Sequence, residues 1–551
     1  MTTAEADRES APPTSSTEES EPTRFARERL PLLVFGIVEG AAFAYYLVLA
    51  RSQWFFSDEW DFLASRGLNA HDLLRAHYGH WVAVPLLVYR VLWAIVGLHS
   101  YLPYASVTIG LHLTAAALLR AIMRRSGVPP WTSTLAASVF VLFGTGAQDL
   151  LWAFQVTFTG ALVLGLVQLL CADHVGPIDR RDWFGITAGL LALMCSGVAV
   201  TMVIVVGIAA LLRRGWRVAA LHTVPLGVVY LAWWARYSRG RYVVGGTPRE
   251  ILAWTISGVA GLFSGLGEIP GVGWAVALVL VCGLGLVVRT RGVAAFGDRL
   301  SMPTALLIGV IGFLVITGYD RGRLGASLAS SSRYLHILGA LVIPAIAVAI
   351  DAIIRYSKTF GRLALAALLV GIPGNVAYAR DRARSDEATA RATRQVMLSV
   401  PAMPLALHVP RALRPEPNLA SQVTLGWLLD GVASGRIPTT RPAGATRLLT
   451  DRLRLSLMEL DRPSDHPCRA LVSRTVVRLD TGEEVGLGRG NLFVQLVSGR
   501  AHSTLVSFGH ALGNPGREHT LVAIRGPLAL IFIPGLIPGR SRSELCTPHR
   551  H

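Results

Sequence analysis

The sequence contains a single lysine, Lys358, and few charged residues of any kind. Only 16% of its 551 residues are charged, whereas 52% are hydrophobic, and the formal net charge of +17 is carried almost entirely by arginine. In a soluble protein such a balance indicates nucleic-acid binding. Here the arginines lie mainly beside long apolar runs, so membrane topology and anionic lipid explain them better. The composition therefore predicts a membrane protein with no nucleic-acid partner.

Cysteine is also scarce, and the five cysteines show no spacing typical of a zinc site. Cys171, Cys195 and Cys282 fall in apolar segments, where we expect them to be inert. Cys468 and Cys546 lie in the polar C-terminal part of the chain. We expect them to form a disulfide, or at least to be adjacent, if that part faces an oxidising compartment.

The apolar runs that remain are long enough to cross a bilayer, which takes about 20 residues of helix. Two of them, 82–98 and 251–267, are short and interrupted by proline, arginine or glycine, and we expect both to lie flat on the exterior surface. The other runs predict about eleven spans, near residues 30–50, 101–123, 131–149, 154–172, 183–195, 197–212, 217–236, 270–289, 302–319, 334–354 and 363–379.

Three parts of the chain differ in composition. Residues 1–29 are rich in Ser, Thr, Glu and Pro and end in arginines, which predicts a disordered cytoplasmic tail. Residues 30–380 form a polytopic, all-helical membrane domain, in which 51–100 is an exterior loop. Residues 381–551 contain no run of bilayer length and predict a soluble exterior domain, α+β or β-rich, with a helix at 425–433. The chain is thus expected in the plasma membrane as a multi-pass protein.

The stretch from Trp54 to Trp81 holds three acids within four positions, Asp58, Glu59 and Asp61, among aromatic residues directly after the first span. In a helix Asp58 and Asp61 share one face and Glu59 points elsewhere. Acids beside a membrane are costly unless they do chemistry or bind a cation. A divalent metal between Asp58, Asp61 and His80 is therefore one expectation. An ordinary solvated loop, with interfacial histidines, is the other interpretation.

A second polar stretch, residues 318–334, carries Arg321, Arg323 and Arg333 on the exterior side. Arginine on that side opposes the usual positive-inside bias, so a ligand is a reasonable cause. Guanidinium groups bind phosphate through two parallel hydrogen bonds. The alternative is that these arginines extend to anionic headgroups.

The order of these features resembles the GT-C integral-membrane glycosyltransferases that use polyprenyl-phosphate sugars, such as protein O-mannosyltransferases and lipid A aminoarabinose transferases. The resemblance spans residues 30–380 and depends on four short features. They are Asp58-Glu59 after the first span, an exterior helix opening near His80 and Pro85, the basic doublet Arg124-Arg125, and Arg333-Tyr334 entering a late span. The exterior helix lacks a clear His-Pro-Pro motif, which is a departure from the family pattern.

The resemblance implies transfer of a sugar from a polyprenyl-phosphate donor to an envelope glycan, lipid or protein on the exterior face, with inversion. It implies Asp58 as the catalytic base beside Glu59. Asp61, His80, Trp81, Arg321, Arg323, Arg333 and Tyr334 are then expected to contact the substrates. A transporter or lipid flippase, and a non-catalytic envelope assembly protein, are the competing hypotheses. The absence of internal repeats in the sequence counts against a transporter.

Overall fold

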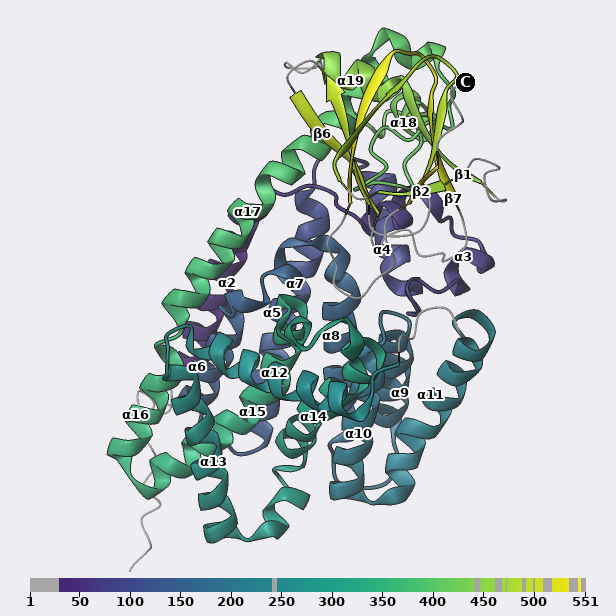
Figure 1. Ribbon diagram of the computed structural model, residues 1–551. Helices are drawn as coiled ribbons and strands as arrows, with labels where there is room; N and C mark the ends of the chain where they lie inside the picture. The colour runs from purple at the N-terminus through teal and green to yellow at the C-terminus, as the bar shows by residue number, and fades with distance from the viewer. Residues whose placement is uncertain are drawn as a thin grey trace, which may run out of the picture.

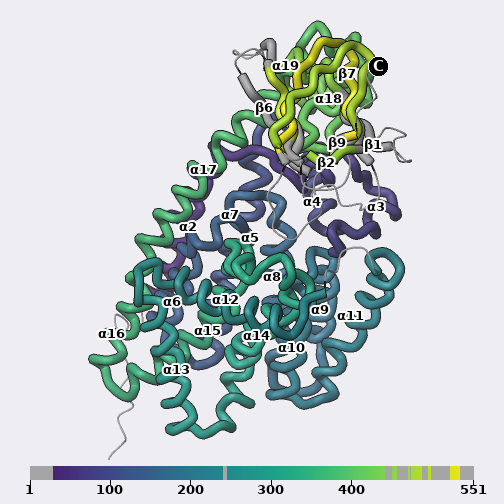
Figure 2. Tube along the Cα trace, in the orientation of Figure 1, coloured from purple at the N-terminus to yellow at the C-terminus, as the bar shows by residue number. Residues whose placement is uncertain are grey.

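The computed structural model describes residues 29–239, 245–440, 446–460, 468–471, 473–487, 492–498, 501–508, 518–534 and 544–546. The predicted tail therefore lies, except for Arg29, outside the described residues. A large bundle of helices carries a small region of helices and strands at one end, and α17 runs diagonally between the two (Figures 1 and 2). The predicted class, a polytopic helical membrane protein with a β-rich C-terminal region, is confirmed.

The membrane bundle is built from long helices joined by short turns. Its helices are α2 (Leu30–Ala50), α5 (Leu102–Arg125), α6 (Pro130–Val141), α7 (Gln148–Leu151), α8 (Val156–Ala172), α9 (Arg180–Leu193), α10 (Val198–Arg214), α11 (Trp216–Tyr237), α12 (Pro248–Gly267), α13 (Val272–Arg291), α14 (Ser301–Arg321), α15 (Ser332–Tyr356), α16 (Lys358–Leu369) and α17 (Ile372–Ser399). Helix α15 lies at the centre, since 89% of its most apolar window is buried inside the protein. The remaining helices pack around it and turn apolar side chains toward lipid.

The starts and ends of these helices follow from local chemistry. Proline occupies the first turn of α2, α5, α6, α12 and α17, where its missing N–H costs nothing. Capping boxes at Asp179 and Thr247 satisfy the first amides of α9 and α12. Gly215, with φ at 90°, separates α10 from α11, a conformation that glycine adopts without strain.

Nine helical segments of the described chain are long and apolar enough to cross a membrane, against about eleven expected. The difference comes from α6, α9 and α10, which have 12, 14 and 17 residues and so are shorter than a full span. Gly144 ends the first of these runs, and the turn at Met194–Gly197 divides the run that follows α8. The run at 82–98 is α4 (Ala83–Ile95), too short to span, as expected.

The ninth segment is α12, which the sequence placed flat on the exterior surface. Its length and composition class it as a candidate span. Its first half nevertheless packs on the loop side of the bundle: Trp254 donates to Thr317 near the end of α14 (3.0 Å), and Ser330, just before α15, donates to the Ser257 carbonyl (3.1 Å). Because α14 ends and α15 begins on one side of the bundle, this half of α12 lies near that side. The interfacial placement stays a prediction.

The C-terminal region has a helical part and two facing sheets. The helical part contains α18 (Leu425–Ala433), which matches the predicted helix, and α19 (Thr446–Leu453). One sheet has the order β1-β7-β4-β9-β2 and the other β3-β8-β5-β6. Buried side chains from both sheets, among them Val485, Leu496 and Phe532, form one apolar core, so the sheets pack as a sandwich. The strands are β1 (Leu455–Leu460), β2 (Cys468–Ala470), β3 (Thr475–Leu479), β4 (Glu484–Leu487), β5 (Leu492–Ser498), β6 (Ala501–Phe508), β7 (Glu518–Ala523), β8 (Leu528–Pro534) and β9 (Glu544–Cys546).

The two C-terminal cysteines lie together. Strand β2 pairs with β9 so that Cys468 is directly opposite Cys546, and Cys546 is disulfide-bonded. Cys171, Cys195 and Cys282 are free. The predicted adjacency is therefore confirmed.

The helical part of the C-terminal region rests on residues 51–100. From the predicted topology, these residues keep the name exterior loop, and the C-terminal part is named the exterior region. Trp427 of α18 stacks on Trp93 of α4, with ring centroids 5.1 Å apart, and meets Trp60 edge to face at 6.3 Å. The Leu98 amide donates to the Arg436 carbonyl (2.9 Å), and a Cβ at Gly97 would lie 2.1 Å from that same oxygen. The loop and the exterior region are thus packed too closely to move independently at this contact.

The hairpin of α12 and α13 gives a direct test of the helix packing. A Cβ at Gly273 would lie 2.1 Å from the Phe263 carbonyl oxygen, whereas a Cβ at Gly285, in the same helix, meets nothing within 4 Å. Gly273→Ala should therefore lower the midpoint of thermal unfolding, at a cost of about 1–3 kcal/mol. Gly285→Ala should leave it unchanged or raise it, because alanine favours helix. Equal midpoints for the two purified variants would contradict this packing.

Candidate active site in the exterior loop

The exterior loop folds around its own aromatic residues. After α2 the chain reaches a π-helical turn, η2 (Asp61–Ser65), then the short helix α3 (Ala70–Leu74) and α4. Phe55, Trp60 and Phe62 are completely buried. Because these rings anchor the segment at three closely spaced points, the acids between them have fixed directions. A π-turn inside such a segment is common at functional sites.

Glu59 points into the protein and is completely buried. One carboxyl oxygen lies 2.6 Å from the Tyr89 hydroxyl and 3.2 Å from that of Tyr101, and the other accepts from the Phe56 amide (2.7 Å). Burial raises the pKa of Glu59 to about 8, against the hydrogen bonds that oppose the shift. With both oxygens occupied and no access to solvent, Glu59 holds the loop together. The sequence grouped Glu59 with Asp58 as an expected catalytic acid, whereas its side chain is sealed in the interior.

Asp61 orients a histidine. His77 Nδ1 lies 2.8 Å from Asp61, whose carboxylate also pairs with Arg66 (2.7 Å) and accepts from Ser65. Burial acts to raise the pKa of Asp61, but the His77 hydrogen bond and the Arg66 charge outweigh it and hold that pKa below its usual range. Asp61 is therefore ionised and fixes the imidazole of His77 in one orientation.

A two-residue turn sets His77 beside His80. Their backbones exchange two hydrogen bonds of 2.9 Å, and Tyr78 and Gly79 between them have φ of 45° and 87°. Positive φ at both central residues is the geometry of a type I′ turn, which glycine favours. Residues paired in this way project from the same side of the ribbon, so both imidazoles face the same region.

Asp58 is the acid that remains available. One carboxyl oxygen lies 3.8 Å from His77 Nε2, and that nitrogen is buried with no hydrogen-bond partner in the described chain. Burial raises the pKa of Asp58, partly offset by the nearby charges of His77 and Arg333. The prediction that Asp58 and Asp61 share a face is met, since both face His77. The neighbouring Ser57 has a φ of 50°, and its amide binds the Leu419 carbonyl of the exterior region (3.2 Å).

The three arginines of residues 318–334 differ in their partners. Arg323 pairs with Glu250 at the start of α12 (3.8 Å). Arg321 pairs with Asp320 (3.2 Å) and donates to the Tyr334 hydroxyl. Arg333 takes part in none of the ion pairs found among the described residues, and its buried Nε has no hydrogen-bond partner there. Its charge acts on Asp58 and on His80, whereas Arg321 acts on His80 and not on Asp58.

The other residues expected to contact the substrates pack against neighbouring parts of the protein. Trp81 stacks on Trp233 of α11, with centroids 5.3 Å apart, and donates to the Leu73 carbonyl. Tyr334 is buried beneath the guanidinium of Arg333, 5.2 Å from its ring centroid. His80 lies against Gly197, where a Cβ would approach its ring to 2.7 Å, and burial together with Arg321 lowers its pKa.

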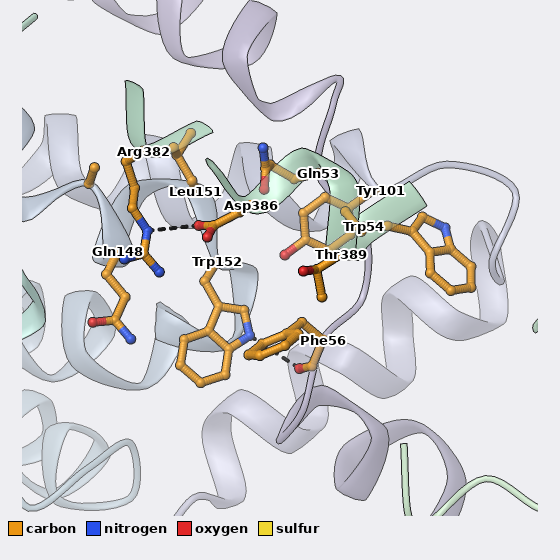
Figure 3. Close-up of a pocket in the computed structure, with 12 residues that line it drawn as sticks. Gln53, Trp54, Phe56, Tyr101, Gln148, Leu151, Trp152, Arg382, Asp386 and Thr389 are labelled. Atoms are coloured by element: carbon orange, nitrogen blue, oxygen red, sulfur yellow. Dashed lines mark hydrogen bonds and ion pairs between the residues drawn. The ribbon is translucent and has the colours of Figure 1, made fainter. Parts of the chain in front are cut away.

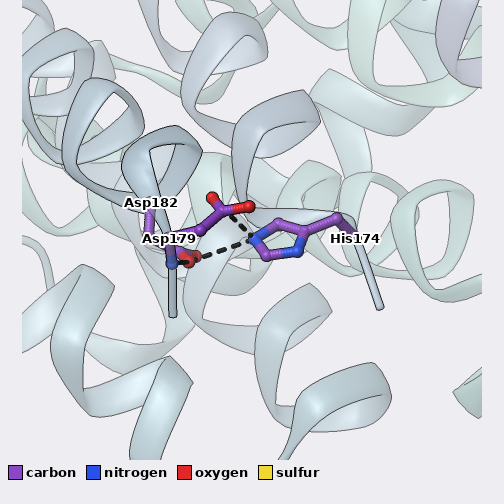
Figure 4. A group of neighbouring side chains, drawn as sticks. All are labelled: His174, Asp179 and Asp182. Carbon is purple, nitrogen blue, oxygen red and sulfur yellow. Dashed lines mark hydrogen bonds and ion pairs between the residues drawn. The ribbon is translucent and has the colours of Figure 1, made fainter. Parts of the chain in front are cut away.

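The structure does not bring the expected metal ligands Asp58, Asp61 and His80 to the mutual spacing of a metal site. Among the described residues only His174, Asp179 and Asp182 have the spacing of a metal site (Figure 4). Asp61 already binds Arg66, His77 and Ser65.

The His174 cluster is itself an ion network at the other end of the bundle. Both Asp182 oxygens bind Arg214 (2.5 and 3.3 Å), and His222 lies 3.0 Å away. A guanidinium in that position repels a cation, so this cluster ties α9, α10 and α11 together.

Sequence reasoning missed a buried polar chain behind Arg333. Asp149 of α7 lies 3.1 Å from His336 Nδ1, at ion-pair distance without hydrogen-bond alignment. His336 Nε2 lies 2.9 Å from His112 Nδ1, and His112 Nε2 lies 3.1 Å from the Val141 carbonyl. Because that carbonyl only accepts, His112 donates to it and accepts from His336. Nδ1 of a neutral His336 then carries a lone pair toward Asp149. The rule that intramembrane ionisable residues are functional candidates was the available signal.

The buried carboxyl of Glu59 predicts a pH dependence of stability. Its pKa is about 8 in the folded protein against an ordinary value of 4.5, so folding binds a proton between these limits. This contribution is complete below pH 4.5 and is lost as the pH rises through 8. The thermal midpoint of the wild type should fall across this range, and that of Glu59→Gln should fall less. Glu387→Gln, an exposed acid on α17, is the control; identical slopes for wild type and Glu59→Gln would refute the assignment.

Comparison with known proteins finds a similarity of fold and no similarity of sequence family. No family model matches the sequence, and no curated protein matches it. The chain is similar to the crystal structure of ArnT from Cupriavidus metallidurans bound to undecaprenyl phosphate, with a TM-score of 0.45 and 14% identity, over 77% of this chain and 92% of that one. The apo structure of the same ArnT gives 0.44 and 13% with equal coverage. The chemistry of the site rests on its own residues.

Proposed function

We propose that the protein is a membrane glycosyltransferase that moves a sugar from a polyprenyl-phosphate donor to a cell-envelope acceptor on the exterior face. Asp58 is the base, and Arg333 binds the donor phosphate. The resemblance noted in the sequence suggests this reaction, and the geometry of the exterior loop supports it. The identity of the sugar and of the acceptor is left open.

The observation that carries the proposal is the pairing of an available acid with an available cation. Asp58 is the acid of the loop that is neither sealed in the interior, as Glu59 is, nor bound by an arginine, as Asp61 is. Among the three exterior arginines, Arg333 is the one without an ion pair in the described chain. A donor phosphate beside Arg333 would complete the charge balance that the protein leaves open.

The reaction needs one proton transfer and one displacement. Asp58 takes the proton of an acceptor hydroxyl, and the acceptor oxygen attacks the anomeric carbon of the donor sugar. The bond from that carbon to the phosphate oxygen breaks, and polyprenyl phosphate leaves with the electron pair. Arg333 stabilises the negative charge on the leaving oxygen. A raised proton affinity at Asp58 favours this role, and a single displacement inverts the anomeric centre.

Charge and redox chemistry support the exterior placement of the site. Arginines end α5, α10, α13 and α15, which marks that end of the bundle as cytoplasmic under the positive-inside rule. The acidic loop and the C-terminal region lie at the opposite end. The disulfide at Cys546 fits an oxidising compartment there. A polyprenyl donor would reach the site laterally from the bilayer.

A proton-coupled transporter is the second candidate, and the chain of Asp149, His336 and His112 favours it. Shared protons among buried titratable groups are typical of transport pathways. In a transporter, loss of Asp149 or His336 would abolish movement of substrate while the exterior loop acids mattered little. In a glycosyltransferase, loss of the loop acid Asp58 should abolish activity, and loss of Asp149 or His336 should matter less.

The first test removes the base. Asp58→Asn keeps the shape of the side chain and loses the proton acceptor, so sugar transfer should fall by roughly 10²–10⁴-fold while the thermal midpoint stays unchanged. Transfer is measured with purified protein in liposomes, as release of polyprenyl phosphate from a panel of polyprenyl-phosphate monosaccharides. Asp381→Asn, an exposed acid on α17, should match the wild type. Full activity of Asp58→Asn would show that Asp58 is not the base.

The second test concerns the phosphate. Arg333→Ala should reduce transfer strongly, and Arg333→Lys should restore it only in part, because lysine keeps the charge and loses the planar fork. Arg323→Ala is the matched control, since Arg323 already pairs with Glu250. A larger loss in Arg323→Ala than in Arg333→Ala would place the phosphate elsewhere in residues 318–334.

A further inference from the structure

A cavity opens beside the acidic loop, between α7, the segment that follows α2, and α17. Its volume is about 140 Å³ (Figure 3). A cavity of about 150 Å³ holds one benzene molecule, so this one has room for a single six-membered ring. Phe56 and Trp152 form one side of it, and Gln53, Gln148, Arg382 and Thr389 contribute polar groups.

The lining matches the two surfaces of a sugar. Phe56 is 38% exposed, and Trp152 is half-buried, so both rings have surface free for contact. Sugars present apolar C–H faces to aromatic rings and hydroxyl groups to polar side chains around the rim. Gln148 makes no side-chain hydrogen bond within the described part of the chain, and the hydroxyl of Thr389 points inward in Figure 3. An apolar wall with a few convergent polar groups is the usual form of a small-molecule site.

The charges of the cavity argue against a phosphate. Arg382 Nε donates to Asp386 at 2.8 Å, so the one cation of the lining is neutralised by the one anion. An anionic ligand would have to displace that carboxylate. A neutral, hydroxyl-rich ring meets no such cost.

The cavity shares its wall with the acidic loop. Trp152 Nε1 donates to the Phe56 carbonyl (3.3 Å), and the Phe56 amide binds Glu59, next to Asp58. Tyr101, also in the lining, binds the same Glu59. A ring held in this cavity therefore lies next to the segment that positions Asp58.

We infer that this cavity is a carbohydrate subsite, which holds a neutral sugar ring of the acceptor through Trp152 and Phe56. The assignment of this sugar to the acceptor rests on the proposed function. The binding of a sugar ring does not, because the cavity is defined by its own residues.

The test measures binding, with full-length protein in lipid nanodiscs free of glycoside detergent. Saturation-transfer NMR is recorded with a panel of neutral methyl glycosides, and with dodecyl phosphate as the competing lipid-phosphate probe. At least one glycoside should receive saturation from the wild type. Trp152→Leu removes the ring surface and should weaken that binding roughly tenfold. Thr389→Phe, at an exposed position of α17, should block the cavity without disturbing the fold.

Two controls separate this inference from the catalytic proposal. Trp183→Leu, an exposed tryptophan on α9, should bind as the wild type does. Asp58→Asn should also bind normally, whatever its activity. No signal from any glycoside, or equal signals from wild type, Trp152→Leu and Thr389→Phe, would overturn the subsite even if Asp58 proves catalytic. Signal from dodecyl phosphate alone, lost in the same variants, would make the cavity a lipid-phosphate site and the inference wrong.

Discussion

The hydrogen bonds of Glu59 determine the geometry of the exterior loop. A carboxyl group that is completely buried must find partners inside the protein, and Glu59 finds them in Tyr89, Tyr101 and the Phe56 amide. Tyr89 belongs to α4 and Tyr101 directly precedes α5, so one side chain joins the loop to two helices. The exterior region supports the same segment from outside through the Leu419 carbonyl, which binds the amide of Ser57. Asp58 lies between these two anchored points, so its backbone is held on both sides.

The three loop acids therefore have separate tasks that depend on their surroundings. Glu59 is structural, Asp61 is ionised and orients His77, and Asp58 is left with a raised proton affinity. Their order of burial explains why neighbouring residues of similar chemistry are not interchangeable. The same reasoning separates the arginines, because Arg321 and Arg323 have carboxylate partners and Arg333 has none in the described chain. The aromatic cavity at Trp152 adds a neutral site on the other side of the same segment.

Much of this arrangement was predictable from local sequence. The long apolar runs gave the membrane helices, the residues 425–433 gave α18, and the three-residue spacing of Asp58 and Asp61 placed both on one face. The sequence could not show which acid has which role, since the hydrogen-bond partners of Glu59 are 30 and 42 residues away along the chain. The expected metal ligands Asp58, Asp61 and His80 do not have the mutual spacing of a metal site, and Arg66 and His77 already bind Asp61. Asp149 and His336 are far apart in the chain and lie at the edges of apolar runs, so only the fold brings them together.

The central claim is that the site breaks the bond between a sugar and a polyprenyl phosphate. The most direct measurement follows a labelled polyprenyl-phosphate sugar in liposomes that contain only the purified protein and a hydroxyl acceptor. The account predicts that free polyprenyl phosphate and glycosylated acceptor form in equal amounts, with the anomeric configuration inverted. Movement of the intact donor from one leaflet to the other, with no polyprenyl phosphate released, would contradict it and identify a transporter.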